Sequence, residues 1–432
     1  MESRLILILL LILTLPTQAA TFEELNTAFG IPIWSDENLW DDEPTETAQR
    51  LGWPKESNTS TDVSFRSYPE ETTRVLGARP YSLALYGEKS EGRPEEKLGV
   101  SALSMMFSNK GDAVPYKTGK LDSHEAAARS KAIQEFKATI GTDQAALEKT
   151  ITDVLGKPTN ARFGTGAQTR ENVKRWEWNG HAILLAAPKD EYAAVRIIPV
   201  EPPPVPGTSF QPKARIPDTV LKARLASNVE TLPSGDVLIK NIPMVDQGPK
   251  GYCVPATWER VMRYMGIPAD MYILAMAANT AAGGGTNAAA IAAGAKEAIT
   301  RGGRQLAQEQ GRPNVTTAKK YISKGIPLIW GVYIAEKEIE FSNRRFERAK
   351  TIASGPEGID LWNKTLAEKR RGANKIKPDH QKGHVRLIVG YNEATKEIAV
   401  SDSWGIDGTC VRWITEEEAA AISQPGLQYI NL

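Results

Sequence analysis

Residues 246–258 read Asp246-Gln247-Gly248-Pro249-Lys250-Gly251-Tyr252-Cys253-Val254-Pro255-Ala256-Thr257-Trp258, and this stretch decides how the C-terminal half of the chain folds. The apolar residues after the cysteine recur at helical spacing, at Trp258, Val261, Met262 and Met265. Cys253 therefore begins a helix, where free backbone N–H groups and the helix dipole stabilise a thiolate. Gln247 can bring its side-chain amide back beside the sulfur and donate to an oxyanion there. Taken alone, the stretch leaves two interpretations open, an activated nucleophile or an inert buried thiol.

The composition excludes several classes of function. The chain has 432 residues, which suggests two or three domains, and its net charge of +1 gives no reason to expect a nucleic-acid partner. Two cysteines, Cys253 and Cys410, are too few for a disulfide scaffold, although a disulfide between them remains open. Because the sequence has no Cys/His metal spacing, phosphate-binding loop or dinucleotide fingerprint, we expect no metal and no cofactor.

The first residues predict export. Leu5–Leu15 is an apolar run too short to span a bilayer comfortably, and small residues follow it. We expect a signal peptide over residues 1–19, cleaved near Ala19, and a secreted or periplasmic protein. An uncleaved N-terminal anchor is the alternative. No later apolar run is long enough to predict a membrane span in the mature chain.

A proline-rich linker over residues 201–217 divides the remainder into two domains. Residues 20–200 predict a smaller α+β domain that carries no cluster of chemically active residues. Its expected elements include a helix over residues 21–29, helices over 124–140 and 143–155, and a hairpin at Asn179-Gly180, whereas much of residues 20–65 gives no clear period. The domain can be an inhibitory prosegment, a substrate- or partner-binding module, or a structural partner.

Residues 218–432 predict a second α+β domain. Helices are expected over residues 269–282, 288–299 and 315–324, and strands over 325–334, 384–390, 397–402 and 410–414, the last three in an antiparallel sheet. Residues 335–382 are rich in charge and predict an exposed helical insertion, which is either a solvated face or a basic surface for an acidic wall polymer. Gly283-Gly284-Gly285 is either a flexible loop or a point where a substrate backbone comes close.

Two residues far along the chain supply possible partners for Cys253. His384 opens one strand and Asp402 ends the next, so an antiparallel return places them at the same end of the sheet. A carboxylate on one imidazole nitrogen fixes the tautomer and leaves the other nitrogen facing the thiol. Trp404 follows closely and could cover the pair.

This order of residues resembles the papain-like cysteine peptidases, and most closely the bacterial C39-like peptidase family. The resemblance rests on Asp246-Gln247-Gly248 before Cys253, on Gly383-His384 and on Asp402-Ser403-Trp404-Gly405, and it covers roughly residues 240–415. It implies a papain-like fold with Gln247 in the oxyanion hole, Cys253 as nucleophile, His384 as general base and Asp402 as the orienting residue. Papain itself has asparagine at the last position, so Asp402 fits the C39-like branch. The charged insertion before His384 departs from the family pattern.

We therefore expect an exported cysteine peptidase acting on a protein or peptide substrate. Gly251, Tyr252 and Trp404 are candidate substrate-binding residues because they flank the expected catalytic groups. Three alternatives remain open: an amidase or endopeptidase for peptidoglycan peptides, a leader peptidase, and an exported binding protein without activity. The predicted signal segment argues against the leader peptidase, which would work in the cytoplasm.

Overall fold

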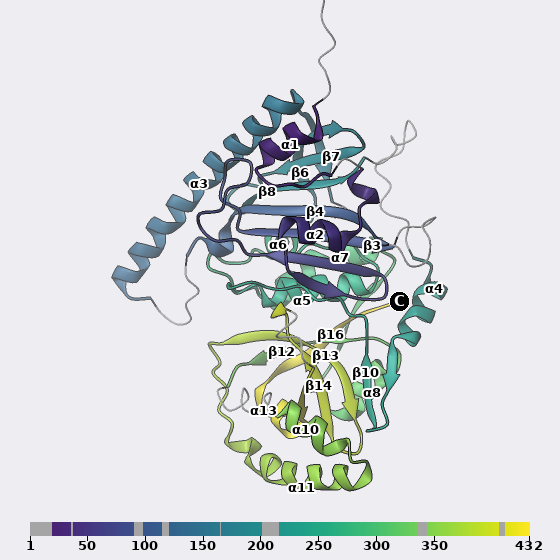
Figure 1. Cartoon of the computed structure of the whole chain (residues 1–432). Coiled ribbons are helices and arrows are strands. Elements are labelled where there is room, and N and C mark those ends of the chain that lie inside the picture. Colours follow the sequence, from purple (N-terminus) through teal and green to yellow (C-terminus); the bar gives the residue numbers. More distant parts are fainter. Residues whose placement is uncertain are drawn as a thin grey trace, which may run out of the picture.

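The structure, a computed structural model, describes residues 20–35, 38–89, 98–114, 121–164, 166–200, 216–335, 344–405 and 411–432. The predicted signal segment, residues 201–215 of the predicted linker, and Cys410 lie outside the described residues. Two sheets dominate the molecule, one built by residues before 200 and one by residues after 228 (Figure 1). The α+β class expected from the sequence is confirmed. Within the described residues, no helix is long and apolar enough to cross a membrane.

The N-terminal sheet has eight strands in the order β1-β2-β3-β4-β8-β7-β6-β5, and all of its pairs are antiparallel. Its strands are β1 (Lys55–Asn58), β2 (Asp62–Ser67), β3 (Ser82–Lys89), β4 (Leu98–Asn109), β5 (Thr159–Phe163), β6 (Glu171–Trp178), β7 (His181–Ala186) and β8 (Tyr192–Pro199). Its helices are α1 (Phe22–Phe29), η1 (Leu39–Asp41), α2 (Pro44–Leu51), η2 (Lys110–Asp112) and α3 (Ser123–Leu155).

One prediction for this part of the chain is wrong in an instructive way. The two helices expected on either side of residues 141–142 are a single 33-residue helix, α3. Thr142 does not cap a new helix, because its hydroxyl donates to the carbonyl of Ala138 one turn earlier, at 3.2 Å. A glycine inside a helix costs only about 1 kcal/mol, so Gly141 does not end it. Asp122 caps the start in a capping box with Glu125.

Other expectations for the N-terminal part have mixed outcomes. The Asn179-Gly180 hairpin is confirmed, since both residues have positive φ (43° and 75°), as a tight two-residue turn between β6 and β7 requires. The expected irregular segment instead contains α2, β1 and β2. These two strands escaped prediction because buried polar residues interrupt their apolar alternation.

The C-terminal sheet runs β11-β16-β12-β13-β10-β9, with β14 pairing with both β13 and β15. Its strands are β9 (Val229–Thr231), β10 (Asp236–Ile239), β11 (Gln305–Glu309), β12 (Leu328–Tyr333), β13 (Gly383–Asn392), β14 (Glu397–Ser401), β15 (Arg412–Thr415) and β16 (Ser423–Asn431). Its helices are α4 (Asp218–Ser227), α5 (Cys253–Tyr264), α6 (Met271–Ala277), α7 (Ala288–Arg301), α8 (Val315–Ile322), α10 (Arg345–Ile352), α11 (Pro356–Gly372), η3 (Ala373–Lys375) and α13 (Glu416–Ile422). The expected antiparallel arrangement is confirmed.

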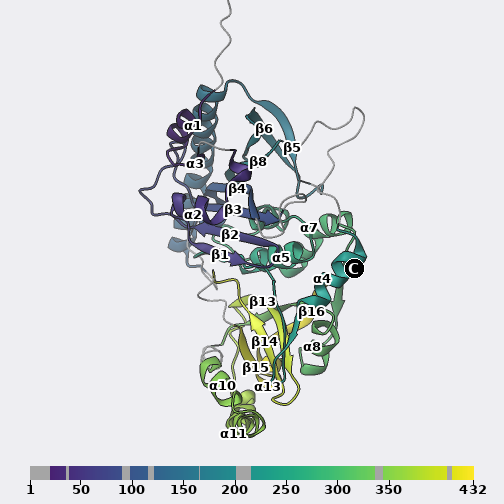
Figure 2. The same ribbon diagram turned by 45° about the vertical axis from the view of Figure 1, so that its right-hand side comes forward.

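Helix α5 lies between the two sheets (Figure 2), and α6 packs beside it (Figure 1). One apolar cluster contains Met106 and Leu184 of the N-terminal sheet together with Ala256 of α5 and Tyr272 of α6. The helix that begins at Cys253 therefore has the N-terminal sheet on one side and the main C-terminal core on the other. Both parts of the chain determine where the start of α5 lies.

The charged insertion contains helices α10 and α11, as expected, but it is not only a solvated face. Arg348 is buried and pairs with Asp236 (2.7 Å) and Glu397 (2.7 Å), and its guanidinium lies over the ring of Trp413. Trp362 of α11 donates to the same Glu397 at 3.1 Å. A buried arginine between two carboxylates anchors this helical hairpin to the sheet.

Candidate active site

Cys253 is the first residue of α5, and its side chain is buried but not sealed, with 9% of its surface exposed. The thiol is free and hydrogen-bonds with His384 and with the backbone at Val385 and Val254. Burial alone raises the pKa of Cys253. The bond to His384, the imidazolium charge and the two backbone contacts act in the other direction and bring this pKa below its ordinary value. The position favours a thiolate at the helix start.

His384 and Asp402 meet at the end of the sheet nearest α5. Strand β13 presents His384 and the residue after β14 is Asp402, so the antiparallel return brings them together. His384 Nε2 lies 2.7 Å from Asp402 Oδ1, which leaves Nδ1 for the thiol. Burial lowers the pKa of His384, but the bonds to Asp402 and Cys253 outweigh it and raise the pKa to about 9. The raised pKa of His384 and the lowered pKa of Cys253 both favour a protonated ring beside a thiolate.

Two arginines hold Asp402 in its charged form. Arg386 Nε lies 3.0 Å from Asp402 Oδ1, and Arg412 Nη1 lies 3.3 Å from Oδ2. Burial of this carboxyl opposes its ionisation, yet the two guanidinium groups and His384 hold its pKa far below the usual range. A carboxylate that stays ionised can orient the imidazole and stabilise its positive charge without taking its proton.

Trp404 covers the histidine. Its ring stacks on His384 with centroids 5.2 Å apart, and the Arg412 guanidinium lies 4.6 Å from the tryptophan ring. The indole is 37% exposed, which makes it the large apolar side chain next to the histidine that an incoming chain would meet. Its placement is compatible with both shielding and substrate contact.

Gln247 lies on the loop before α5, and its backbone is joined to the residue after Asp402. The Gln247 N–H donates to the Ser403 carbonyl at 2.9 Å, and its side-chain Nε2 is 3.5 Å from the Lys250 carbonyl, a weak bond. Its Oε1 is buried without a hydrogen-bond partner among the described residues. The amide is therefore held loosely and can turn at little cost.

Gly251 and Tyr252, the other candidate substrate-binding residues, make contacts within the protein itself. Gly251 accepts a hydrogen bond from the N–H of Gly285 at 3.0 Å, so the triple-glycine loop comes close to the chain's own backbone. Tyr252 is 2% exposed, and its hydroxyl bonds to Asn109 (2.5 Å) and Gly111 (3.0 Å) of the N-terminal part. In this arrangement the Tyr252 phenol is unavailable to a substrate.

Arg260 connects the segment before Cys253 to the segment around Asp402, although no sequence motif marks it. It donates to the Pro243 carbonyl (3.0 Å), to the Asp402 carbonyl (3.0 Å) and to Ser401 Oγ (2.8 Å). Burial lowers its pKa to about 10, and the Asp402 charge opposes that fall. A helical position seven residues after Cys253 was a weak signal for this role.

Arg386 had a stronger sequence signal for a place in the site, because it lies two residues after His384 on the same face of the strand.

No group of three or more His, Cys, Asp and Glu residues in the described part of the chain could hold a metal ion.

Comparison with known families places the site within a recognised segment. Residues 239–427 match the model of the Peptidase_C39 like family, and Gln247, Cys253, His384 and Asp402 all lie within the match. The N-terminal sheet lies outside it. A search of curated proteins finds no match.

Proposed function

Because residues 239–427 belong to the Peptidase_C39 like family, we propose that the protein is an exported cysteine peptidase that hydrolyses peptide bonds at Cys253. The observation that carries the proposal is the continuous set of hydrogen bonds from Cys253 through His384 to Asp402 at the start of a helix. Nucleophile, base and orienting carboxylate are the three groups that acyl transfer by a thiol requires.

The proposed reaction has two steps. The Cys253 thiolate attacks the amide carbonyl carbon, and the resulting oxyanion accepts hydrogen bonds from the Cys253 backbone N–H and from the Gln247 amide after it turns from Lys250. His384 gives its proton to the amine as the C–N bond breaks, leaving a thioester. Water then gives a proton to His384 and attacks the thioester, which releases the carboxylic acid and restores the thiolate.

Substitution of the two cysteines tests the nucleophile. Cys253→Ala should abolish hydrolysis of casein and of cell-wall preparations while the thermal unfolding midpoint stays close to that of the wild type. Cys410→Ala is the matched control, because it removes the other cysteine of the chain, and it should keep activity. Equal hydrolysis by wild type and Cys253→Ala would contradict the proposal.

The same assays separate the alternatives. Clearing of cell-wall zymograms without casein cleavage would indicate a peptidoglycan amidase or endopeptidase. No hydrolysis of either substrate, together with slow alkylation of Cys253, would indicate a binding protein. Export rests on the apolar run Leu5–Leu15, and N-terminal sequencing of the protein recovered outside the cytoplasm tests the cleavage expected near Ala19.

A further inference from the structure

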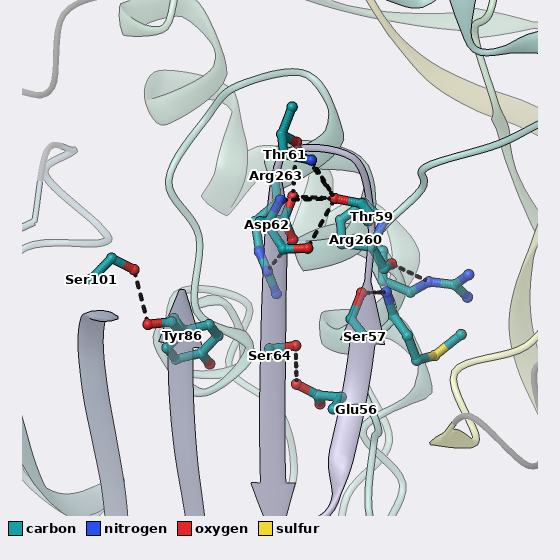
Figure 3. A network of polar contacts seen from close by, with 12 residues as sticks. Glu56, Ser57, Thr59, Thr61, Asp62, Ser64, Tyr86, Ser101, Arg260 and Arg263 are labelled. Carbon is teal, nitrogen blue, oxygen red and sulfur yellow. Dashed lines mark hydrogen bonds and ion pairs between the residues drawn. The ribbon is translucent and has the colours of Figure 1, made fainter. Parts of the chain in front are cut away.

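The segment that leads to Gln247 is held from outside its own domain. Residues 241–248 pass along strands β1 and β2, where Ser57 Oγ accepts from the Met244 N–H at 2.9 Å and Asn241 Oδ1 accepts from the Ser60 N–H at 3.1 Å. Figure 3 shows Ser57, Thr59 and Asp62 of this hairpin beside Arg260 and Arg263 of α5. The N-terminal part thus contacts the segment immediately before the candidate oxyanion residue.

Asp246, the residue directly before Gln247, is fixed at both of its backbone polar groups. Its N–H donates to Glu56 Oε1 at 2.8 Å, and its carbonyl accepts from the Tyr68 hydroxyl at 2.7 Å. The Tyr68 ring also lies against Gly248, which has φ +69°, so closely that a Cβ there would be 2.6 Å from the ring. The backbone on either side of Gln247 therefore has little freedom to move.

Glu56 is itself held rigidly inside the N-terminal sheet. Its side chain is 1% exposed and pairs with Arg66 Nε at 2.5 Å, while Ser64 Oγ donates to its other oxygen at 2.9 Å. Arg66 in turn donates to Tyr86 (3.0 Å) and Ser82 (3.3 Å). Because several partners fix the buried Glu56 carboxylate in one position, its Oε1 also fixes the position of the Asp246 N–H.

From these contacts we propose that Glu56 and Tyr68 are positioning residues for the Gln247 loop, so that the N-terminal domain completes the oxyanion site and activates the enzyme. The inference rests on the peptidase function proposed above. The domain contacts the loop through Asp246 and Gly248 and through the buried side chain of Tyr252, and it leaves Trp404 partly exposed. An inhibitory prosegment would have to cover the catalytic groups themselves.

Removing the whole domain is a poor test, because Tyr252, Met271 and Tyr272 are buried in the apolar cluster shared with the N-terminal sheet. Point variants of the full chain are sharper. Tyr68→Phe removes only the hydroxyl that holds the Asp246 carbonyl and keeps the ring against Gly248. Tyr192→Phe is the matched control, because it also removes a tyrosine hydroxyl of the N-terminal part, one whose partner is the Glu171 side chain (2.6 Å) and not the backbone around Gln247. It should lose at least as much stability as Tyr68→Phe, because its hydroxyl bonds to a carboxylate and that of Tyr68 bonds to a carbonyl.

Two rates distinguish positioning from a structural role. Peptide hydrolysis passes through an oxyanion, whereas alkylation of a thiolate by iodoacetamide does not. Tyr68→Phe should lower kcat about tenfold with little change in KM, because a small displacement of an oxyanion donor weakens transition-state stabilisation. Its alkylation rate at Cys253 should stay within about twofold of the wild type, and Tyr192→Phe should match the wild type in both rates.

The activity of the wild type separates a wrong positioning role from a wrong peptidase proposal. If wild type hydrolyses peptides and Tyr68→Phe hydrolyses them equally well, the positioning role is wrong. A parallel fall in hydrolysis and alkylation would also overturn it, since the substitution would then act on the thiol or on the whole fold. Ser57→Ala, which removes the acceptor for the Met244 N–H, is a second variant and should show the same pattern with a smaller loss. An inactive wild type with an unreactive Cys253 would instead refute the peptidase itself.

Discussion

Asp402 and Glu56 are both buried carboxylates paired with arginine, and they act on the candidate site from the two different sheets of the molecule. Asp402 bonds to a ring that can gain or lose a proton, so its charge controls the protonation of His384. Glu56 bonds to a backbone N–H that cannot titrate, so it controls only where the Gln247 loop lies. The same kind of carboxylate–arginine pair therefore controls charge at His384 and backbone position at the Gln247 loop.

The largest expected effect comes from Asp402→Asn. This change removes the charge that stabilises the imidazolium and allows the wrong tautomer, so kcat/KM should fall about 10³–10⁴-fold. The pKa of His384 should also drop from about 9, because the bond to Asp402 is the largest contribution that raises it. A pH–rate profile measures both changes, and a full rate with an unmoved alkaline limb would contradict the assigned role of Asp402.

Glu56→Gln is the isosteric change at the other carboxylate and should behave differently. The amide oxygen can still accept from Asp246, so hydrolysis should fall no more than about threefold, and the alkaline limb should not move. The free energy of unfolding should decrease by about 3 kcal/mol, because Arg66 stays buried without its carboxylate. A shift of the alkaline limb in this variant would show that Glu56 also influences the protonation of His384, which would contradict its purely geometric role.

The raised pKa of His384 should also make the free energy of unfolding depend on pH. A group whose pKa is higher in the folded state stabilises the fold fully below its unfolded pKa of about 6.5 and loses that contribution as pH rises through about 9. In a Cys253→Ala background, which removes the opposite contribution of the lowered Cys253 pKa, the loss of unfolding free energy caused by His384→Gln should therefore shrink between these pH values, because the bond to Asp402 still raises the pKa of His384. Chemical denaturation at pH 6 and pH 10 tests the sign. A difference that grows with pH would be inconsistent with a resting imidazolium.

The smallest effect is expected at an ion pair between the N-terminal sheet and α5 that does not contact the Gln247 loop. Asp62 pairs with Arg263 of α5 at 3.0 Å, and both side chains are partly exposed. Asp62→Asn should reduce the free energy of unfolding by about 1 kcal/mol and leave hydrolysis unchanged. A loss of hydrolysis in Asp62→Asn would mean that any weakening of the contact between the N-terminal sheet and α5 lowers activity, so that Glu56 and Tyr68 have no special role.

The sequence predicts the part of the site that depends on local patterns. The helical spacing after Cys253 locates the start of α5, and two consecutive antiparallel strands must bring His384 and Asp402 to the same end. The same patterns located β6, β7 and their tight turn. These features need only the period of a helix or strand and the chemistry of a turn.

The remainder depends on contacts between residues far apart in sequence. Strands β1 and β2 bury Glu56, Ser64 and Arg66, so their polar residues hide the alternation that normally indicates a strand. Arg348 looked like one charge among many in the insertion, although it is buried between Asp236 and Glu397. No local pattern indicates which charged side chain will find buried partners in another element.

The most direct test of the account is the pH dependence of Cys253 alkylation by iodoacetamide, followed by mass spectrometry of the modified peptide. An activated thiolate should give selective modification of Cys253, with a rate that is already high below the ordinary thiol pKa of about 8.5 and that falls strongly in His384→Ala. A rate that rises only above pH 8.5, or that is the same in His384→Ala, would contradict an activated thiolate at the start of α5.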